Sequence, residues 1–194
     1  MIRIVKANKV DNMNREMSVL FVDSFYDYFK SFCFSKEKLY RICKNIFNLE
    51  KFYVALLNNE LIGIGACCDG SSSIKFKKYS MYRNLGIKEG KRLYKYLKTI
   101  FVDRDYSFDM DKECGMIEFV TVREDCRNKK IGYTLVNHIM CDNDYKRYLA
   151  KVGDTNSSAR KMLDNIGLEI FDEEAATGKE KEDVGVNKYL YISS

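Results

Sequence analysis

The residues best suited to chemistry lie in one short basic segment, Arg127-Asn128-Lys129-Lys130. It offers three cationic side chains, and a stretch with helical periodicity starts directly after it, at Ile131. The first N–H groups of a helix have no acceptor within the helix, and the helix dipole adds positive potential there. Such a place favours anions, phosphate groups above all. We therefore expect a phosphorylated ligand at this segment, and a pyrophosphate would fit.

A predicted strand and a predicted helix hold this segment in place. Residues 116–122 read Met-Ile-Glu-Phe-Val-Thr-Val, a short β run. Strict alternation would put Met116, Glu118, Val120 and Val122 on one face and Ile117, Phe119 and Thr121 on the other. After the basic segment the apolar residues follow a helical period, with one stripe formed by Ile131, Leu135 and Ile139.

A second strand and helix follow, with Asn156 placed 24 residues after Gly132. Residues 148–152 favour a strand, and Thr155 or Asn156 can cap the helix behind it. The buried stripe of this helix would consist of Ala159, Met162, Leu163 and Ile166. Gly167 is suited to end the helix in a left-handed conformation.

These two segments resemble the GNAT superfamily of acyl-CoA N-acyltransferases. The family signature, R/Q-x-x-G-x-G/A at the start of a helix, corresponds to Arg127 through Gly132, with Lys130 in place of the first glycine and Tyr133 following. The family pattern N-x-x-A-x-x-F-Y-x-x-x-G-F corresponds to Asn156, Ala159, Met162, Gly167 and Leu168. The resemblance is close over roughly the last 80 residues and holds only in outline over the first 70. The first segment, taken alone, has an alternative interpretation without a ligand. It would then be a basic connection between a strand and a helix in an ordinary α/β domain.

The resemblance implies acetyl-CoA as cosubstrate, with its pyrophosphate on the signature loop. The pantetheine arm would lie against the main chain of Val120, Thr121 and Val122, with Asn156 near it. The loop residues that the resemblance assigns to cofactor binding are Arg127, Asn128, Lys129, Lys130, Ile131, Gly132 and Tyr133.

Two further residues bear on catalysis. Glu118 is the one ionisable residue on the predicted signature strand, and some members of the family use a carboxylate on this strand as general base. We expect Glu118 in that role, or ordering the water that serves as base; pairing with a surface cation is the alternative. Leu163 stands where the family often has a tyrosine that acts as general acid, so the acid must be another group or solvent.

Composition agrees with one compact enzyme domain over residues 1–194. The chain is 46% hydrophobic, and no apolar run approaches the ~20 residues that cross a bilayer. We expect a cytoplasmic protein without a membrane partner. The seven cysteines include no C-x-x-C pair and mostly lie in apolar runs, which is typical of reduced, buried thiols. A single histidine makes a histidine-based metal site or a Ser/His/Asp triad improbable, and no metal is expected.

The N-terminal elements complete an α/β (α+β) fold. The pattern predicts a strand over 1–6, helices over 13–32 and 36–47, and a hairpin of strands 52–57 and 61–68. Residues 169–171 and 187–193 favour a closing antiparallel pair. The resemblance implies a mixed, mainly antiparallel central sheet flanked by helices. It also places the acceptor amine in a cleft between the first helices and the central strands. The aromatic residues around Phe25 would either line this cleft or belong to the hydrophobic core.

A basic helical insertion precedes the signature strand, over about 71–114. Residues 75–104 contain ten Lys or Arg and two acids, a net charge of +8, so the rest of the +5 chain sums to −3. Lys88, Lys91, Lys95 and Lys98 lie on one helix face and Leu93 and Leu97 on another. The insertion is either a solvated face, a wall of the acceptor site, or a contact for anions, a membrane surface or nucleic acid.

Taken together, the sequence predicts an acetyl-CoA-dependent N-acetyltransferase. Its partner would be the primary amine of an unidentified small molecule or peptide. Nucleic acid is not expected as the usual partner, and a homodimer stays open. The competing prediction is a catalytically weak CoA-binding or RNA-contacting module, suggested by Leu163 and the basic insertion.

Overall fold

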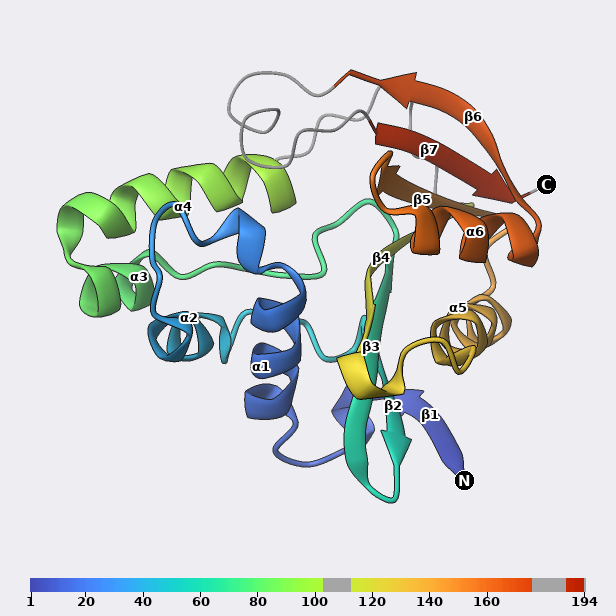
Figure 1. Ribbon diagram of the computed structural model, residues 1–194, viewed down its shortest axis with the longest axis horizontal. Coiled ribbons are helices and arrows are strands. Elements are labelled where there is room, and N and C mark those ends of the chain that lie inside the picture. Colours follow the sequence, from blue (N-terminus) through green and yellow to red (C-terminus); the bar gives the residue numbers. More distant parts are fainter. Residues whose placement is uncertain (103–112, 176–187, 194) are drawn as a thin grey trace.

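The computed structural model describes residues 1–102, 113–175 and 188–193. Its strands form one sheet in the order β1-β2-β3-β4-β5-β7-β6 (Figure 1). Their bounds are β1 Ile2–Lys6, β2 Phe52–Leu57, β3 Glu60–Cys68, β4 Cys114–Val122, β5 Arg147–Gly153, β6 Leu168–Glu174 and β7 Lys188–Ser193. The β4–β5 pair is parallel and every other pair is antiparallel. The expected mixed, mainly antiparallel sheet is confirmed.

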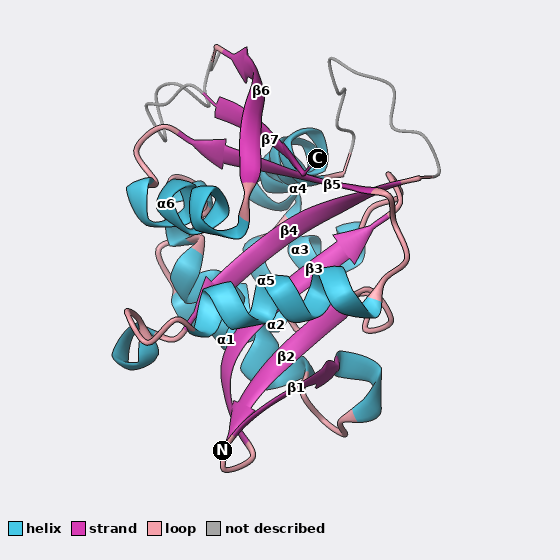
Figure 2. Cartoon of the chain, turned by 90° about the vertical axis from the view of Figure 1, so that its right-hand side faces the viewer, coloured by secondary structure: helices cyan, strands magenta, loops and turns pink. Residues whose placement is uncertain are grey.

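Helices cover both faces of this sheet. On one face lie α1 (Asn14–Ser24), α2 (Lys36–Cys43), α3 (Lys78–Leu85) and α4 (Ile87–Phe101). On the other face lie α5 (Ile131–Asp142) and α6 (Ser157–Ile166), seen in front of the sheet in Figure 2. Short 3-10 turns occur at Ala7–Lys9 (η1), Tyr26–Tyr28 (η2) and Glu124–Cys126 (η3).

Local sequence signals place several of these elements correctly. Asn58 and Asn59 join β2 to β3 with φ angles of 51° and 66°, the left-handed pair that a tight hairpin needs. The Asn156 side chain caps α6 by accepting a hydrogen bond from the N–H of Ala159. Gly167 ends the same helix at φ 94°.

The helix expected over 13–32 is wrong in its second half, because α1 ends at Ser24. Large apolar side chains follow at too many angles for one helix to bury them. In the segment around the turn η2, Phe29 is fully buried and Phe25 half-buried, while Phe34 remains 82% exposed. Phe21 is the centre of this aromatic core, with ring centroids of Phe25 and Phe47 at 5.0 and 5.6 Å.

The strict alternation expected along β4 is also wrong, because the strand contains a bulge. Glu118 pairs with Ala66 and Thr121 with Ile64. Two residues of β4 therefore lie between these pairs where β3 has only one, which defines a bulge. Phe119, with φ 52°, is the extra residue, and its ring lies 5.5 Å from that of Phe21 on the α1 side. Beyond the bulge, Thr121 therefore faces α1, whereas Val120 and Val122 face α5.

The insertion is a helical hairpin built into the main core. Met81 from α3 and Leu93 and Leu97 from α4 are fully buried in the same cluster as Phe21. The segment before α3 runs beside residues 46–48, where Ile74 bridges to Phe47. The lysines expected on one face of α4 point away from this core, and Lys88, Lys91 and Lys95 are exposed. Arg104 and the rest of the insertion up to residue 112 lie outside the described residues.

Six of the seven cysteines are buried and free, and Cys141 is exposed. The part of the chain that the structure describes contains no helix long and apolar enough to span a membrane.

Helices α3 and α4 approach each other closely at Gly90, and a substitution there tests this packing. A Cβ atom at this position would lie 2.9 Å from the carbonyl carbon and oxygen of Met81, closer than real contacts allow. Replacing glycine by alanine inside a helix normally stabilises it by ~1 kcal/mol. Here we expect Gly90→Ala to lower the free energy of unfolding by about 1–3 kcal/mol, as overpacking does. Urea denaturation measures the change.

The matched control is Lys91→Ala, one residue further on an exposed face, which should change stability by less than ~0.5 kcal/mol. A Gly90→Ala protein more stable than the parent would contradict the crossing geometry.

Candidate active site

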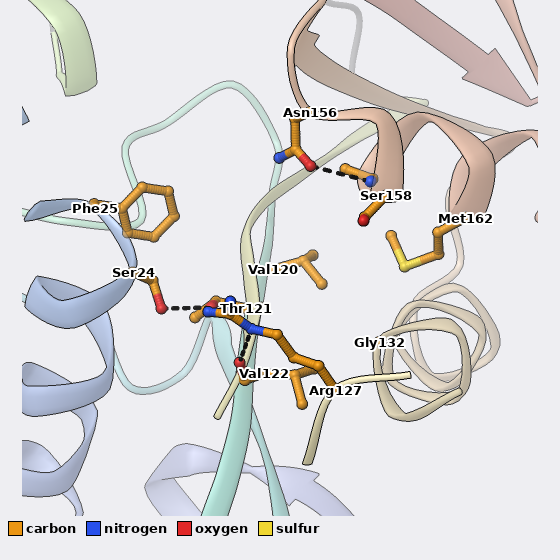
Figure 3. Close-up of a pocket in the computed structure, with 11 residues that line it drawn as sticks. Ser24, Phe25, Val120, Thr121, Val122, Arg127, Gly132, Asn156, Ser158 and Met162 are labelled. Atoms are coloured by element: carbon orange, nitrogen blue, oxygen red, sulfur yellow. Dashed lines mark hydrogen bonds between the residues drawn. The ribbon is translucent and has the colours of Figure 1, made fainter. Parts of the chain in front are cut away.

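A cleft of about 340 Å³ opens between α1, β4 and the starts of α5 and α6 (Figure 3). Three apolar side chains of its wall, Val120, Val122 and Met162, face the α5 side of the sheet. The lining residues are Ser24, Phe25, Val120, Thr121, Val122, Arg127, Gly132, Asn156, Ser158, Ala159 and Met162. The cleft therefore joins the end of the first helix to the basic loop some hundred positions later in the sequence.

The edge of β4 is open along this cleft. Pairing between β4 and β5 runs from Cys114↔Arg147 to Ile117↔Ala150 and is not recorded beyond that point in the described residues. Thr121 and Val122 pair with Ile64 and Gly63 on the β3 side, so the main-chain groups on the β5 side face the cleft. Buried main-chain groups need hydrogen-bond partners. A ligand with amide groups in an extended arm, such as pantetheine, could supply them.

The loop before α5 forms the other end of the cleft. The N–H groups of Ile131, Gly132 and Tyr133 begin the helix and so have no acceptor within it. Lys130 precedes them in the left-handed region at φ 59°, and Asn128 has φ 61°. The left-handed backbone at Lys130 explains why glycine is common at this position of the family signature.

The cations of the loop differ in orientation. The Nε atom of Arg127 donates a hydrogen bond of 3.2 Å to the carbonyl oxygen of Val122, which holds the guanidinium against the cleft wall (Figure 3). Lys129 donates to the carbonyl oxygen of Asp125 at 3.0 Å, behind the loop. Arg123 pairs with the Asp125 carboxylate and lowers its pKa, mainly through their hydrogen bond. Arg123 thereby compensates the negative charge of the Asp125 carboxylate, which lies beside a loop expected to hold an anion.

Gly132 lies where the two C-terminal helices approach each other. A Cβ atom built there would meet the Met162 sulfur of α6 at 3.1 Å and a methyl of Val122 at 3.7 Å. Any larger side chain would have to extend from this tight position at the helix start. Glycine thus keeps the N–H groups of α5 accessible from the cleft.

Glu118 does not line this cleft. Its side chain is 7% exposed, and its Oε2 atom accepts a 2.6 Å hydrogen bond from the hydroxyl of Ser73, at the start of the insertion. Because of the bulge, Glu118 lies on the α1 side of the sheet, away from the face of Val120 and Val122.

The structure brings together six of the predicted cofactor residues: Val120, Thr121, Val122, Arg127, Gly132 and Asn156. The other loop residues flank the cleft without lining it. Ile131 is 3% exposed and packs into the core, so only its main chain could touch a ligand, and Tyr133 is 39% exposed. Asn128, Lys129 and Lys130 are exposed around the loop.

The sequence prediction missed Ser24 as a cleft residue. Its side chain forms a 2.6 Å hydrogen bond with the hydroxyl of Thr121. The signal was a serine within the apolar stripe of α1, directly before Phe25. Of the aromatic residues considered for the acceptor site, Phe25 alone lines the cleft.

Leu163 is 2% exposed and packs with Leu135, Val136 and Ile139 of α5. The neighbouring residue on α6 that faces the cleft is Met162. The described residues that line the cleft include no carboxylate, histidine, cysteine or tyrosine. As far as the described residues go, a proton could reach this cleft through solvent or from groups behind its wall.

Comparison with known proteins adds independent information. Residues 15–168 match the model of the acetyltransferase (GNAT) family. No curated protein matches the sequence. Solved structures do share the fold: an N-acetyltransferase from Staphylococcus aureus Mu50 aligns with a TM-score of 0.69 at 11% identity, over 98% of this chain and 99% of that one.

Two further structures illustrate the range of similar folds. An acetyltransferase of the GNAT family from Bacillus cereus ATCC 10987 has a TM-score of 0.60 at 10% identity, covering 100% of this chain and 97% of that one. A chain of the NatC complex bound to Gag peptide and CoA has a TM-score of 0.57 at 13% identity, with 99% and 97% covered.

The cleft geometry predicts which change harms acetyl-CoA binding most. We expect Gly132→Val to weaken acetyl-CoA affinity more than Arg127→Ala, because the valine side chain fills the space between the helix start and Met162. Arg127→Ala removes one of several donors and should cost about 1.5–3 kcal/mol of binding free energy. Isothermal titration calorimetry with acetyl-CoA measures both.

Gly132→Ala serves as the graded control, since Met162 is flexible enough to yield a few tenths of an ångström to one methyl group. Unchanged affinity in a folded Gly132→Val protein would rule out this loop as the binding site.

Proposed function

The chain belongs to the acetyltransferase (GNAT) family, and from this premise we propose that it transfers the acetyl group of acetyl-CoA to the primary amine of a small molecule or peptide. The observation that carries the proposal is the open β4 edge that leads to the free N–H groups of α5. An extended amide-containing arm and a pyrophosphate need these two features at the two ends of one cleft. The fold similarity to a chain of NatC, solved with a peptide and CoA, supports a peptide amine as one class of acceptor.

In the proposed reaction the ammonium form of the acceptor loses a proton and the free amine attacks the thioester carbonyl; the nitrogen loses a second proton to solvent as the amide forms. Negative charge then develops on the carbonyl oxygen, where main-chain N–H groups of the open edge can stabilise it. The new C–N bond forms, the C–S bond breaks, and its electron pair leaves with the sulfur.

Turnover of acetyl-CoA with a panel of amines, followed by the release of free thiol, tests the activity. Release that depends on the amine supports the transferase. Tight acetyl-CoA binding without release for any amine would instead support the alternative, a CoA-binding module with weak or lost catalysis. RNA contact, the other form of that alternative, would appear as binding that weakens steeply with salt.

We propose Glu118 as the source of basicity, acting through a water molecule because its carboxylate lies behind the cleft wall. Thr121 and Glu118 flank the bulge on the same side of the sheet, so a water at the bulge could connect the carboxylate to the cleft. The Ser73 hydroxyl orients the carboxylate from the other side. The insertion thus contributes to the site through Ser73.

Glu118→Gln should lower kcat by about 10²–10⁴, because the amide keeps the shape and the hydrogen bond from Ser73 but cannot accept a proton. Acetyl-CoA affinity should change little. The measurement is kcat between pH 6 and 9 with the best amine of the panel.

Ser73→Ala is the matched variant, since it removes the orienting hydroxyl and leaves the carboxylate. It should cost less activity than Glu118→Gln. A loss below threefold for Glu118→Gln across that pH range would show that Glu118 is not the base.

We further propose that the α3–α4 hairpin biases acceptor choice through its charge. No described residue of the hairpin lines the cleft, so the earlier possibility of a direct wall is replaced by a field effect. Residues 75–102 carry nine cations and one acid, Glu89, which Arg92 already pairs. The hairpin packs on the segment that follows Phe25, with Tyr96 against Phe32 at 4.9 Å. Its field should favour amines that carry a carboxylate or phosphate over polyamines.

The test changes Lys88, Lys91, Lys95 and Lys98 to Gln and compares kcat/KM for anionic and cationic amines. We expect the preference for anionic amines to shrink, and the difference between parent and variant to fade at high salt. The matched control changes four scattered exposed lysines, Lys9, Lys38, Lys44 and Lys161, which lowers the formal net charge from +5 to the same +1. If the hairpin variant keeps the parent's ranking, the lysines are only a solvated face.

A further inference from the structure

Two hydroxyl groups from distant parts of the chain meet in the wall of the cleft. Ser24 ends α1 and Thr121 lies beyond the bulge of β4, and their Oγ and Oγ1 atoms are 2.6 Å apart (Figure 3). Both side chains line the cleft and both are partly exposed to it. Within the described residues the pair makes no other hydrogen bond.

Such a pair retains one proton for a ligand. A hydroxyl donates one hydrogen bond, so one member uses its proton on the other and the second proton stays free to point into the cleft. The bond inside the pair also polarises the outer hydroxyl and strengthens its donation. The cleft therefore contains a fixed donor whose position depends on both α1 and β4.

The donor meets a need of the proposed reaction. The leaving group of an acetyl transfer from a thioester is a thiolate, which hydrogen bonds stabilise. At position 163, where the family resemblance implies a tyrosine, this chain has a leucine buried in the core. Arg127 comes from the anion loop, and its Nε donates to the carbonyl oxygen of Val122, the residue after Thr121.

The direction of the cleft indicates which part of a bound coenzyme approaches the pair. The pyrophosphate would lie at the start of α5, near Gly132, and an extended arm would follow the open β4 edge past Val122 and Thr121. Its sulfur end then points towards the bulge and the end of α1. Ser24 and Thr121 line the cleft there, whereas Asn156 and Ser158 line it from the start of α6.

We propose that the Ser24–Thr121 hydroxyl pair donates a hydrogen bond to the coenzyme A sulfur and stabilises the departing thiolate. This rests on the proposed function. When the amine attacks, the C–S electron pair passes to the sulfur, which accepts the hydrogen bond from the pair. The thiolate is later protonated by water, so neither hydroxyl changes its own protonation state.

The test uses free coenzyme A, and so needs no knowledge of the acceptor. The thiolate absorbs in the ultraviolet, and titrating the saturated complex gives the pKa of the bound thiol. A thiol such as that of cysteine ordinarily has a pKa of about 8.5. A hydrogen bond to the charged form lowers it, and we expect a decrease of about one unit on binding to the parent protein, a tenfold rise in the thiolate-to-thiol ratio.

Ser24→Ala and Thr121→Val should each raise the pKa of the bound thiol towards that of the free coenzyme, because the remaining hydroxyl loses the partner that fixes and polarises it. Ser24→Thr retains a hydroxyl and should keep the lowered pKa. Affinity for acetyl-CoA, whose sulfur carries no charge, should stay within about twofold in all three. With an active amine, the two hydroxyl-free variants should lower kcat and leave the KM for acetyl-CoA nearly unchanged.

The outcomes separate this inference from the proposed function. If coenzyme A does not bind to the parent protein, the proposed function fails. If it binds and the thiol has the same pKa in the parent and in Ser24→Ala, the pair is not a thiolate donor. Reduced thermal stability without a change in thiol pKa would likewise overturn the proposal, because the pair would then be a structural link between α1 and β4.

Discussion

The left-handed backbone of Phe119 is the constraint on which the rest of this structure depends. A bulky residue at φ 52° costs roughly 1–2 kcal/mol relative to an ordinary strand conformation. The cost is offset by the ring, which packs against Phe21, Phe25 and Phe52 at centroid distances of 5.5, 5.9 and 6.2 Å. Aromatic pairs contribute about 0.5–1.5 kcal/mol each beyond their buried area. The bulge is therefore stabilised by the helices of the α1 side.

Three features of the site follow from this residue. The recorded pairing with β5 ends at Ile117, two positions before the bulge, so the remaining edge of β4 faces the cleft. The extra residue turns Thr121 towards α1, where it meets Ser24. Glu118, before the extra residue, also lies on the α1 side of the sheet, where its carboxylate accepts a hydrogen bond from Ser73. A regular strand would have placed Thr121 and Glu118 on opposite faces.

The site thus has two ends of different origin. The anion end is local, because Arg127 to Tyr133 form one loop and one helix start whose N–H groups are free by geometry. The other end, where we propose that the acceptor binds, is assembled from α1, the bulged strand and, through the contact of Ser73 with Glu118, the insertion. The α3–α4 hairpin joins the core through Met81, Leu93 and Leu97 and presents Lys88, Lys91 and Lys95 outwards.

The sequence by itself determined the elements whose signals are local. Asn58-Asn59 specified the hairpin, Asn156 and Gly167 marked the ends of α6, and the loop from Arg127 to Gly132 identified the helix start and the family. Tertiary structure alone decided the rest. Period-two alternation cannot reveal a bulge, because the left-handed Phe119 is held by rings from α1 and β2 that are distant in sequence. The helix expected over 13–32 ends at Ser24, where Phe25 takes a non-helical φ of −113° and the chain passes into the turn η2. The same long-range packing placed Glu118 behind the cleft and brought Ser24 to Thr121, a contact between residues 97 positions apart that no local pattern contains.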